Sequence, residues 1–488
     1  MPTLALLVPL FPLVCAALIA AAGWRRPTAW LGPVSAAATL AAGIVLAVHI
    51  LDDDPVTALG DLVRIDALSA FMIIVIGLVA LIATTYGVTF IDGELRVGDT
   101  TAVKARRYGI LVELFLAAML GAVVADNLGA LWVAIEATTV ATAFLINHRG
   151  TPASLEASWK YILIGSVGVA LAFLGTILVY FASHHSGGAA GGTLSWSRLT
   201  DQASGLDPGV MRLAVGLLVL GYGTKVGLAP LHTALPDAYS QAPAPVSALM
   251  SGALLPVAFY ALLRYKTIAD AALGPDYMRG LLLAGALLSL GVAASLLIAQ
   301  RDYRRLLAYS SIEHMGVVVL GAAIGSPLAM AATLLHVLGH GMGKAVLFCS
   351  SGEILRTDGG SEIGAVRGLL VRKPVVGAAF GFGLLALLGL PPFSLFASEL
   401  GIARAGFDEG LGWAVTLALV LTLAIFAVIL GHAERMLLGE PDAEQSRDPV
   451  RRMAALPLVG GLVTLAVLGI SIWPIQRLLV AAAAVITG

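Results

Sequence analysis

The stretch that decides the fold is residues 211–231, MRLAVGLLVLGYGTKVGLAPL, where Lys225 interrupts a run long and apolar enough to cross a bilayer as a helix. A lysine near the hydrocarbon centre costs from about 3 to more than 10 kcal/mol unless water or a counter-ion meets it. Charged residues at such depth therefore tend to mark ion pathways. We expect Lys225 to lie on a route for protons.

The whole chain has the composition of a membrane protein. Of its 488 residues, 59% are hydrophobic and 12% are charged, and the mean hydropathy is +0.93. A soluble protein needs a larger polar surface, so we expect an all-α polytopic membrane protein in contact with the lipid bilayer. The formal net charge is -1, and the absence of a basic run or stacking aromatics in the sequence gives no sign of a nucleic-acid partner.

The cysteines and the N-terminal run exclude two further interpretations. Cys15 and Cys349 lie in separate apolar runs and form no CxxC pair, so we expect no iron-sulfur cluster and no other cofactor in this chain. The N-terminal apolar run has no basic residue before it, and Arg25 and Arg26 follow it, which is the reverse of a signal peptide. We expect this run to be a retained first span.

Apolar runs recur along the chain with short linkers and leave no soluble domain. Their length and hydropathy predict about 14 spans. The spans lie near residues 2–22, 29–51, 67–91, 108–125, 128–147, 161–182, 211–231, 245–263, 280–299, 305–324, 328–351, 374–397, 411–433 and 454–482. Almost no connection is left between the fourth and fifth spans, which meet at Asp126 and Asn127.

Basic residues are divided unevenly between the two sides of the predicted bundle. Of the 29 Lys and Arg residues, about 19 fall in loops after odd-numbered spans and about 8 fall in the other loops. The positive-inside rule then puts the odd-numbered loops in the cytoplasm and both termini outside, in the cell (inner) membrane of a bacterium or archaeon. The remaining two basic residues, Lys225 and Lys344, lie within spans and require an explanation.

Two predicted spans are interrupted by proline. Pro230 and Pro236 follow Lys225, and the sequence LPPF at residues 390–393 precedes Glu399 in the twelfth span. Proline removes a backbone donor, and carbonyls freed at membrane depth are tolerated only inside protein or beside water. Two interrupted spans that each carry an ionisable residue favour a pair of inverted repeats with a half-channel in each. The alternatives are that Lys225 snorkels to the interface and that Glu399 only ends its helix.

Glu136 lies in the middle of the fifth span, in the sequence LWVAIEATTV. Alone in lipid its carboxylate would be neutralised, but a nearby lysine would let both groups stay charged. We therefore pair Glu136 with Lys225. Separating the two would release the proton of the lysine, and renewed contact would reload it. The alternative is a purely structural ion pair between two helices.

The eleventh span carries His336, His340 and Lys344 at intervals of four residues, which keeps them on roughly one helix face with about 6 Å between steps. Imidazole accepts on one nitrogen and donates on the other near neutral pH, so the pattern predicts a proton relay. The alternative is a set of satisfied interior histidines. A metal site would need further ligands, and none is apparent in the sequence, so we expect no metal. His314 is a weaker candidate because its neighbour Glu313 could hold it as a structural pair.

Five segments carry a family resemblance. They are LWVAIEATTV, GYGTKVGLAPLHTALPDAYSQAPAPVSALMSG, RRLLAYSSIEHMG, HVLGHGMGKAVLF and LPPFSLFASEL. Together they resemble the antiporter-like proton-translocating membrane subunits of respiratory complex I, group 4 hydrogenases and Mrp antiporters, closest to the hydrogenase-4 component F type. The resemblance covers roughly residues 100–440. It implies an all-α fold of about 14 helices with two inverted five-helix repeats that contain broken helices 7 and 12.

The resemblance also implies a division of the chain and a set of roles. The expected parts are residues 1–100 with helices 1–3, 101–266 with helices 4–8, 278–437 with helices 9–13, and 454–488 with helix 14. The implied relay consists of Glu136 in the fifth helix, Lys225 in the seventh, His336, His340 and Lys344 in the eleventh and Glu399 in the twelfth, with His314 beside them.

One departure from the family pattern concerns the eighth helix. The family usually has a lysine or histidine there to bridge the two half-channels, whereas this chain has Pro256 in SGALLPVAFYALLRY. The link from Lys225 to His340 would then rest on water alone. We expect a proton-translocating subunit that is no enzyme by itself and that joins other membrane-arm subunits and a peripheral redox module. The alternatives are a subunit of a multi-subunit Na⁺/H⁺ antiporter and a non-transporting scaffold for a peripheral oxidoreductase.

Overall fold

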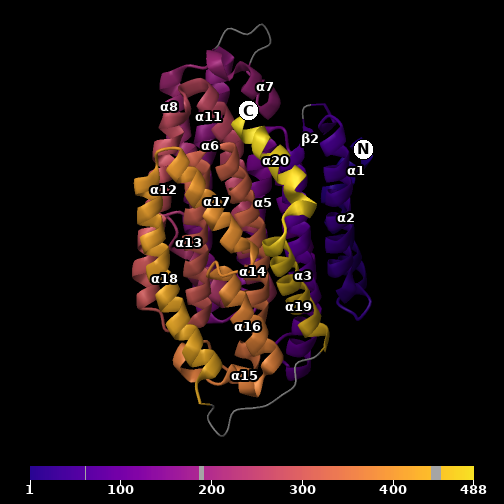
Figure 1. The fold of residues 1–488 in the computed structure, drawn as a ribbon. Coiled ribbons are helices and arrows are strands. Elements are labelled where there is room, and N and C mark those ends of the chain that lie inside the picture. Colours follow the sequence, from indigo (N-terminus) through magenta and orange to yellow (C-terminus); the bar gives the residue numbers. More distant parts are fainter. Residues whose placement is uncertain (61, 186–191, 441–451) are drawn as a thin grey trace.

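The computed structural model describes residues 1–60, 62–185, 192–440 and 452–488, and these are almost entirely helical (Figure 1). Within the described residues, 13 helices are long and apolar enough to span a membrane. The twelfth predicted span is present as two shorter helices. The prediction of an all-α polytopic membrane protein is therefore confirmed.

The spanning helices follow one another along the chain. They are α1 (Pro2–Ala22), α2 (Leu31–Asp52), α3 (Ala67–Val97), α4 (Ala102–Val124), α5 (Leu128–Ile146), α6 (Pro152–His185), α8 (Pro208–Val226), α10 (Ala244–Leu249) continued by α11 (Leu255–Leu273), α12 (Pro275–Ile298), α13 (Tyr303–Ile324), α14 (Pro327–Asp358), α18 (Gly412–Leu438) and α19 (Arg452–Ile470). The twelfth span consists of α16 (Pro374–Leu387) and α17 (Ser394–Asp408). The shorter elements are α7 (Trp196–Gln202), α9 (Ala234–Gln241), α15 (Leu369–Arg372), α20 (Trp473–Thr487), 3-10 turns at Thr28–Trp30, Ala203–Gly205 and Ile363–Ala365, and antiparallel strands β1 (Val56–Ala58) and β2 (Val63–Ile65).

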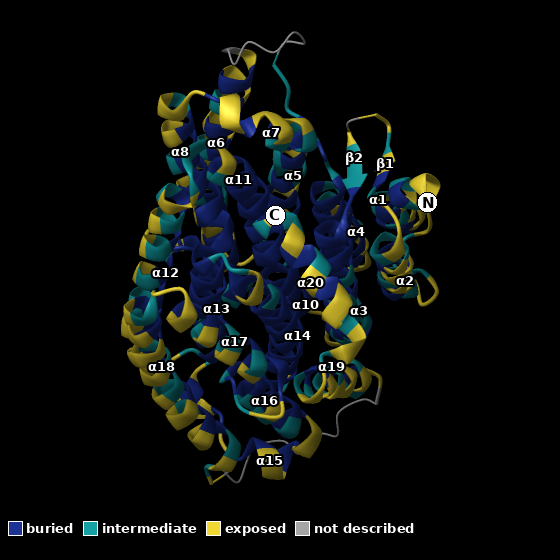
Figure 2. Cartoon of the chain, turned by 45° about the horizontal axis from the view of Figure 1, so that its top comes forward, coloured by how far each residue is buried: buried dark blue, intermediate teal, exposed yellow. Residues whose placement is uncertain are grey.

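The helices that carry most of the polar residues stand in the middle of the bundle. The most apolar windows of α10–α11, α13 and α14 are wholly buried, whereas only about a third or less of those of α1, α18 and α19 is buried. Figure 2 shows this as a buried centre around α13 and α14 with exposed faces on α12, α18 and α19. Ionisable side chains inside a membrane are costly when they face lipid, so the helices that carry them pack against protein on all sides.

Both predicted helix interruptions are present. Helix α8 ends at Val226, where Gly227 adopts φ 90° and its N–H caps the carbonyl of Gly223, and the helical chain resumes at α9. The second interruption separates α16 from α17 and contains Gly389 at φ 64°. Each break leaves helix ends inside the protein, where a helix C-terminus attracts cations and an N-terminus attracts anions. The relation of the two halves as inverted repeats stays a prediction.

Pro256 does not interrupt the eighth span. A π-helical turn at Met250–Leu254 joins α10 to α11, and Pro256 sits in the first turn of α11. In the wider π-helical turn, the N–H of Leu255 bonds the carbonyl of Met250. Pro256, which has no N–H, comes directly after this turn, where the helix can accommodate it. The eighth span is therefore one continuous helix of 30 residues, Ala244–Leu273.

The helix boundaries differ from the hydropathy estimate in several places. Helix α4 begins at Ala102 instead of residue 108 and is capped by the Thr101 side chain, and α6 begins at Pro152 instead of residue 161. Hydropathy detects only the apolar part of a helix, and polar turns at its ends extend it. The predicted single C-terminal span consists of two helices, α19 and α20. Pro474 lies in the first turn of α20 and has no N–H to bond back to a carbonyl of α19, so one continuous helix cannot form there.

The two ends of the chain lie toward the same end of the bundle, the upper one in Figure 1. The connection between α4 and α5 at Asp126 and Asn127 is as short as predicted, and Asn127 caps α5 by accepting from the N–H groups of Gly129 and Ala130. The hairpin of β1 and β2 lies at this end, and Val63 forms a bridge with Ala125.

Candidate functional site

Lys225 and Glu136 are joined through a hydroxyl group. Lys225 Nζ donates to Thr139 Oγ1 at 2.5 Å, and Thr139 Oγ1 donates to Glu136 Oε2 at 3.2 Å. Within the described residues no direct ion pair forms between the lysine and the glutamate. The structure thus brings the two predicted partners together, with Thr139 as an intermediate that the sequence did not single out.

The break in the seventh span places Lys225 at the end of a helix. Lys225 is in the last turn of α8, where the helix dipole favours a positive charge, and it is 3% exposed. Its Nζ lies 4.9 Å from the ring centroid of Tyr161, a distance at which the ring face stabilises a cation. Gly165 on α6 leaves room for the ammonium group, since a Cβ there would lie 3.3 Å from Nζ. A lysine that snorkels to the interface would keep its ammonium group in water, whereas Lys225 is buried inside the protein.

A second polar cluster forms where α13, α14 and α17 meet. His314 Nδ1 and His336 Nε2 share a hydrogen bond at 3.0 Å, and His336 Nδ1 lies 3.0 Å from Ser398 Oγ. A ligand atom each from His314, His336 and Glu399 lie within 4.8 Å of one another. The tertiary structure therefore supplies the further ligand-type groups that the sequence of the eleventh span lacks.

Glu399 lies against the second helix break. A Cβ on Gly389 would come within 2.4 Å of Glu399 Oε2, so only glycine leaves room for the carboxylate there. Glu399 also lines a cavity of about 30 Å³ between α13, α17 and α18. The residue sits in the second turn of α17 and does not end that helix, which extends to Asp408.

Lys344 and His340 complete the predicted ladder on α14. Lys344 Nζ donates to the carbonyl of Leu307 at 2.8 Å and to Ser310 Oγ at 2.5 Å, both on α13. The ring centroids of His340 and His314 are 5.1 Å apart. Among the described protein atoms, neither ring nitrogen of His340 has a hydrogen-bond partner. A buried imidazole without a protein partner needs ordered water to satisfy its ring nitrogens.

The eighth span approaches the ladder at its π-helical turn. Ser251 Oγ and Ser311 Oγ share a hydrogen bond at 2.8 Å, which ties this turn to α13. Gly252 and Gly341 face each other, because a Cβ on either would lie 2.6 Å from the carbonyl oxygen of the other. This close approach sets Ser251 beside the turn of α14 that carries His340. The sequence signal that could have found it is the Ser-Gly pair in LMSGALLP.

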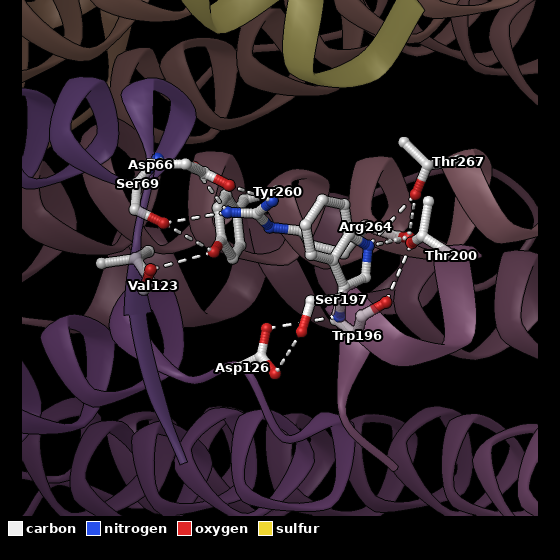
Figure 3. Close-up of polar contacts among 10 residues, drawn as sticks. All are labelled: Asp66, Ser69, Val123, Asp126, Trp196, Ser197, Thr200, Tyr260, Arg264 and Thr267. Atoms are coloured by element: carbon white, nitrogen blue, oxygen red, sulfur yellow. Dashed lines mark hydrogen bonds and ion pairs between the residues drawn. The ribbon is translucent and has the colours of Figure 1, made fainter. Parts of the chain in front are cut away.

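A further buried ion pair joins Arg264 and Asp66, which the sequence did not single out. Arg264 donates to Asp66 in a two-pronged contact, NH1 to Oδ2 at 2.7 Å and NH2 to Oδ1 at 2.8 Å. Figure 3 shows the guanidinium between Trp196 and Tyr260, and its carbon lies 4.2 Å from the Trp196 ring centroid. Tyr260 in turn donates to the carbonyl of Val123 at 2.9 Å. The pair joins the eighth span to the start of α3.

The contact with Arg264 lowers the pKa of Asp66. Burial alone would raise the pKa of the carboxyl, but the Arg264 guanidinium and its hydrogen bonds outweigh burial and lower it below its ordinary value of 3.8. Arg264 lies inside the 30-residue helix of the eighth span and is 3% exposed.

Glu113 is another buried carboxyl group that the sequence did not single out. It lies on α4, is 1% exposed, and has one oxygen without a hydrogen-bond partner among the described residues. Its neighbour on α2 is Gly32, where a Cβ would lie 3.3 Å from Glu113 Oε1. It belongs to neither of the two clusters.

Comparison with known proteins gives concordant results. Residues 125–425 match the family described as NADH:quinone oxidoreductase/Mrp antiporter, TM. The chain is 34% identical to the hydrogenase-4 component F homolog of Methylacidiphilum infernorum (isolate V4), over 96% of this chain and 96% of the relative. It is 32% identical to NADH-quinone oxidoreductase subunit N of Desulforudis audaxviator (strain MP104C), over 84% of this chain and 80% of the relative. The fold resembles a chain of the membrane-bound sulfane sulfur reductase, an archaeal respiratory membrane complex, with a TM-score of 0.88 and 24% identity over 99% of this chain and 97% of that chain.

Proposed function

This chain belongs to the NADH:quinone oxidoreductase/Mrp antiporter family of membrane subunits, and from that premise we propose that it moves protons across the membrane within a multi-subunit, redox-driven complex. The observation that carries the proposal is a pair of buried polar clusters, each beside an interrupted helix, one around Lys225 and one around Glu399. The two named relatives are a hydrogenase-4 component and a subunit of NADH-quinone oxidoreductase. Oxidation and reduction would accordingly take place in partner subunits.

The first cluster supplies a switch for the proton on Lys225. Thr139 has one hydroxyl hydrogen, which it gives to Glu136 while its oxygen accepts from Lys225. Any shift of α5 relative to α8 changes how strongly the carboxylate holds the ammonium in its charged form. A redox step in a partner that displaces one of these helices would then load or release the proton.

The second cluster supplies the proposed exit route for the proton. From Lys225 the proton would pass the π-helical turn at Ser251 and reach His340 and Lys344 on α14 through water. From there the hydrogen-bonded pair of His314 and His336 leads to Glu399 at the second break. Each of these groups can take and give a proton, which is what a relay requires.

The distribution of charge supports an orientation of the chain, and with it a direction of transport. The positive-inside rule assigns the loops rich in arginine and lysine to the cytoplasm, in a bacterial or archaeal cell membrane. Lys225 would then reload from the cytoplasm and Glu399 would release the proton outside, with both termini on the outer side.

The test uses everted membrane vesicles that contain the whole complex. The Lys225→Ala and Glu399→Gln variants should lose proton uptake driven by the electron donor, while electron transfer by the partner subunits is partly retained. The control is Lys104→Ala, because Lys104 is an exposed lysine in the first turn of α4. Normal pumping by both relay variants would refute the proposal.

One alternative function is supported by the family itself, whose description includes Mrp antiporters. In that case proton flux would require sodium and no redox partner. A Na⁺ gradient imposed on vesicles that lack an electron donor separates the two functions, because only an antiporter would then move protons through Lys225.

A further inference from the structure

The second cluster combines two imidazoles and a carboxylate from three different helices. His314 on α13 and His336 on α14 face each other with Nδ1 and Nε2 at 3.0 Å, and an oxygen of Glu399 on α17 completes a group within 4.8 Å. Both histidines are fully or almost fully buried. Two histidine nitrogens and one carboxylate oxygen form a common ligand set of zinc sites that keep a fourth position open.

Each imidazole also has a polar group near its second ring nitrogen. Ser398 Oγ donates its hydrogen to the carbonyl of Leu395 at 2.8 Å, so it accepts from His336 Nδ1–H and leaves Nε2 of that ring with its lone pair. His314 Nε2 lies 3.5 Å from Glu313 Oε2. Metal-bound histidines almost always donate their second ring N–H to such an outer partner, which fixes the tautomer and the ring orientation. His336 therefore has such an outer partner in Ser398, and a carboxylate lies near the second ring nitrogen of His314.

The distances fit a small dication. Two nitrogens bound to tetrahedral Zn²⁺ at about 2.05 Å are roughly 3.3 Å apart, so the rings need to separate by a few tenths of an ångström and to turn until both lone pairs point at the metal. Glu399 has to move further, and its side chain has rotatable bonds to do so. A cavity of about 30 Å³ beside Glu399, between α13, α17 and α18, has room for about one water.

We propose that His314, His336 and Glu399 form a binding site for a borderline divalent metal such as Zn²⁺, and that the bound metal blocks the proton path at this point. The metal takes the place of the proton that the two rings share, so the pair can no longer accept or donate one. Binding stands on the geometry alone, whereas the block rests on the proposed function.

The experiment measures binding separately from transport. The purified complex is incubated with Zn²⁺, passed over a desalting column and analysed for zinc, and Co²⁺ is used in parallel for the visible absorption of tetrahedral cobalt. We expect one additional metal ion per complex, and its loss in the His336→Gln and Glu399→Gln variants. His340→Gln is the matched control, because His340 is equally buried one helical turn away on α14 and should leave binding unchanged. Removing an outer partner in Ser398→Ala should weaken zinc affinity by about 10- to 100-fold.

Equal zinc content and the same cobalt spectrum in wild type and His336→Gln would overturn the inference, and so would loss of binding only in His340→Gln. Glu399→Gln changes one atom, so it keeps the inference testable even if His336→Gln fails to fold. In vesicles, Zn²⁺ should inhibit proton uptake by the wild type in proportion to site occupancy. Full occupancy with undiminished pumping would refute the block and count against the proposed relay. If the wild type binds no metal and these variants still lose pumping, only the metal site is refuted.

Discussion

Lys225 donates to Thr139 at 2.5 Å, and Thr139 in turn donates to Glu136, so two ionisable groups of opposite charge communicate through one hydroxyl. A direct ion pair would lock both charges together, because a buried pair is costly to separate. A hydroxyl between them has a single hydrogen and two lone pairs, and it can rotate. The relay is thus coupled at its first step without a fixed salt bridge.

The first prediction concerns this hydroxyl. Thr139→Val keeps the shape of the side chain but removes the group that links Lys225 to Glu136. Hydrogen bonds to charged groups contribute about 1.5–3 kcal/mol, so proton uptake in vesicles should fall by roughly tenfold to a hundredfold. Thr139→Ser keeps the hydroxyl and should retain most of the activity. Equal rates for the Val and Ser variants would show that the hydroxyl has no role.

A second prediction concerns the contact between the eighth span and α13. Ser251→Ala and Ser311→Ala should each slow proton uptake, and the double variant should be no slower than the worse single variant, because both remove one shared hydrogen bond. The coupling expected from a neutral hydrogen bond is about 0.5–1.5 kcal/mol. Proton uptake rates of the four proteins give this coupling directly. Fully additive losses would mean that the serines act independently.

The third prediction concerns the glycine at the second helix break. Gly389→Ala forces an L-residue into a left-handed conformation, which costs about 1–2 kcal/mol, and also pushes a methyl group into the Glu399 carboxylate. Gly410→Ala is the matched control: its φ of 75° imposes the same backbone cost, but its Cβ would meet open space. Both variants should unfold at lower temperature, whereas only Gly389→Ala should lose proton uptake. Equal proton uptake by the Gly389→Ala and Gly410→Ala variants would show that Glu399 is not part of the transport path.

The fourth prediction concerns the ion pair between Arg264 and Asp66. Asp66→Asn leaves a buried guanidinium without its counter-ion, which should destabilise the protein by about 3–5 kcal/mol at neutral pH. Asp276→Asn removes a partner of Arg279 that is 91% exposed and should change stability by less than about 0.5 kcal/mol. Thermal unfolding in detergent measures both. No difference between the two variants would contradict the proposed role of the pair.

The same pair has a pH dependence. The pKa of Asp66 is lowered in the folded protein, so its carboxylate stabilises the fold above its ordinary pKa of 3.8. This contribution is lost as the pH falls from 3.8 through the lower folded value, where the carboxylate takes up a proton. The difference in unfolding temperature between wild type and Asp66→Asn should therefore be large at neutral pH and shrink below pH 3.8. A difference that grows on acidification would reverse the assigned sign.

Much of the chain could be interpreted without coordinates, because membrane insertion and helix interruption are local properties. Hydropathy located the spans, proline located the breaks after Lys225 and before Glu399, and a charge inside an apolar run identified Lys225, Glu136 and Lys344 as residues that need an explanation. The boundaries were less accurate, since polar turns extend helices such as α4 beyond the apolar core.

Partners between helices were decided only by the tertiary structure. Thr139 is an ordinary helix residue until α5 packs against α8, His314 gains His336 only because α13 and α14 are adjacent, and Arg264 meets a carboxylate that lies 198 residues earlier in the chain. Sequence spacing fixes which residues share a face of one helix, whereas the neighbour of that face depends on how all the helices pack. The sequence thus determined which charged groups enter the membrane, and the packing of the bundle determined which group each of them meets.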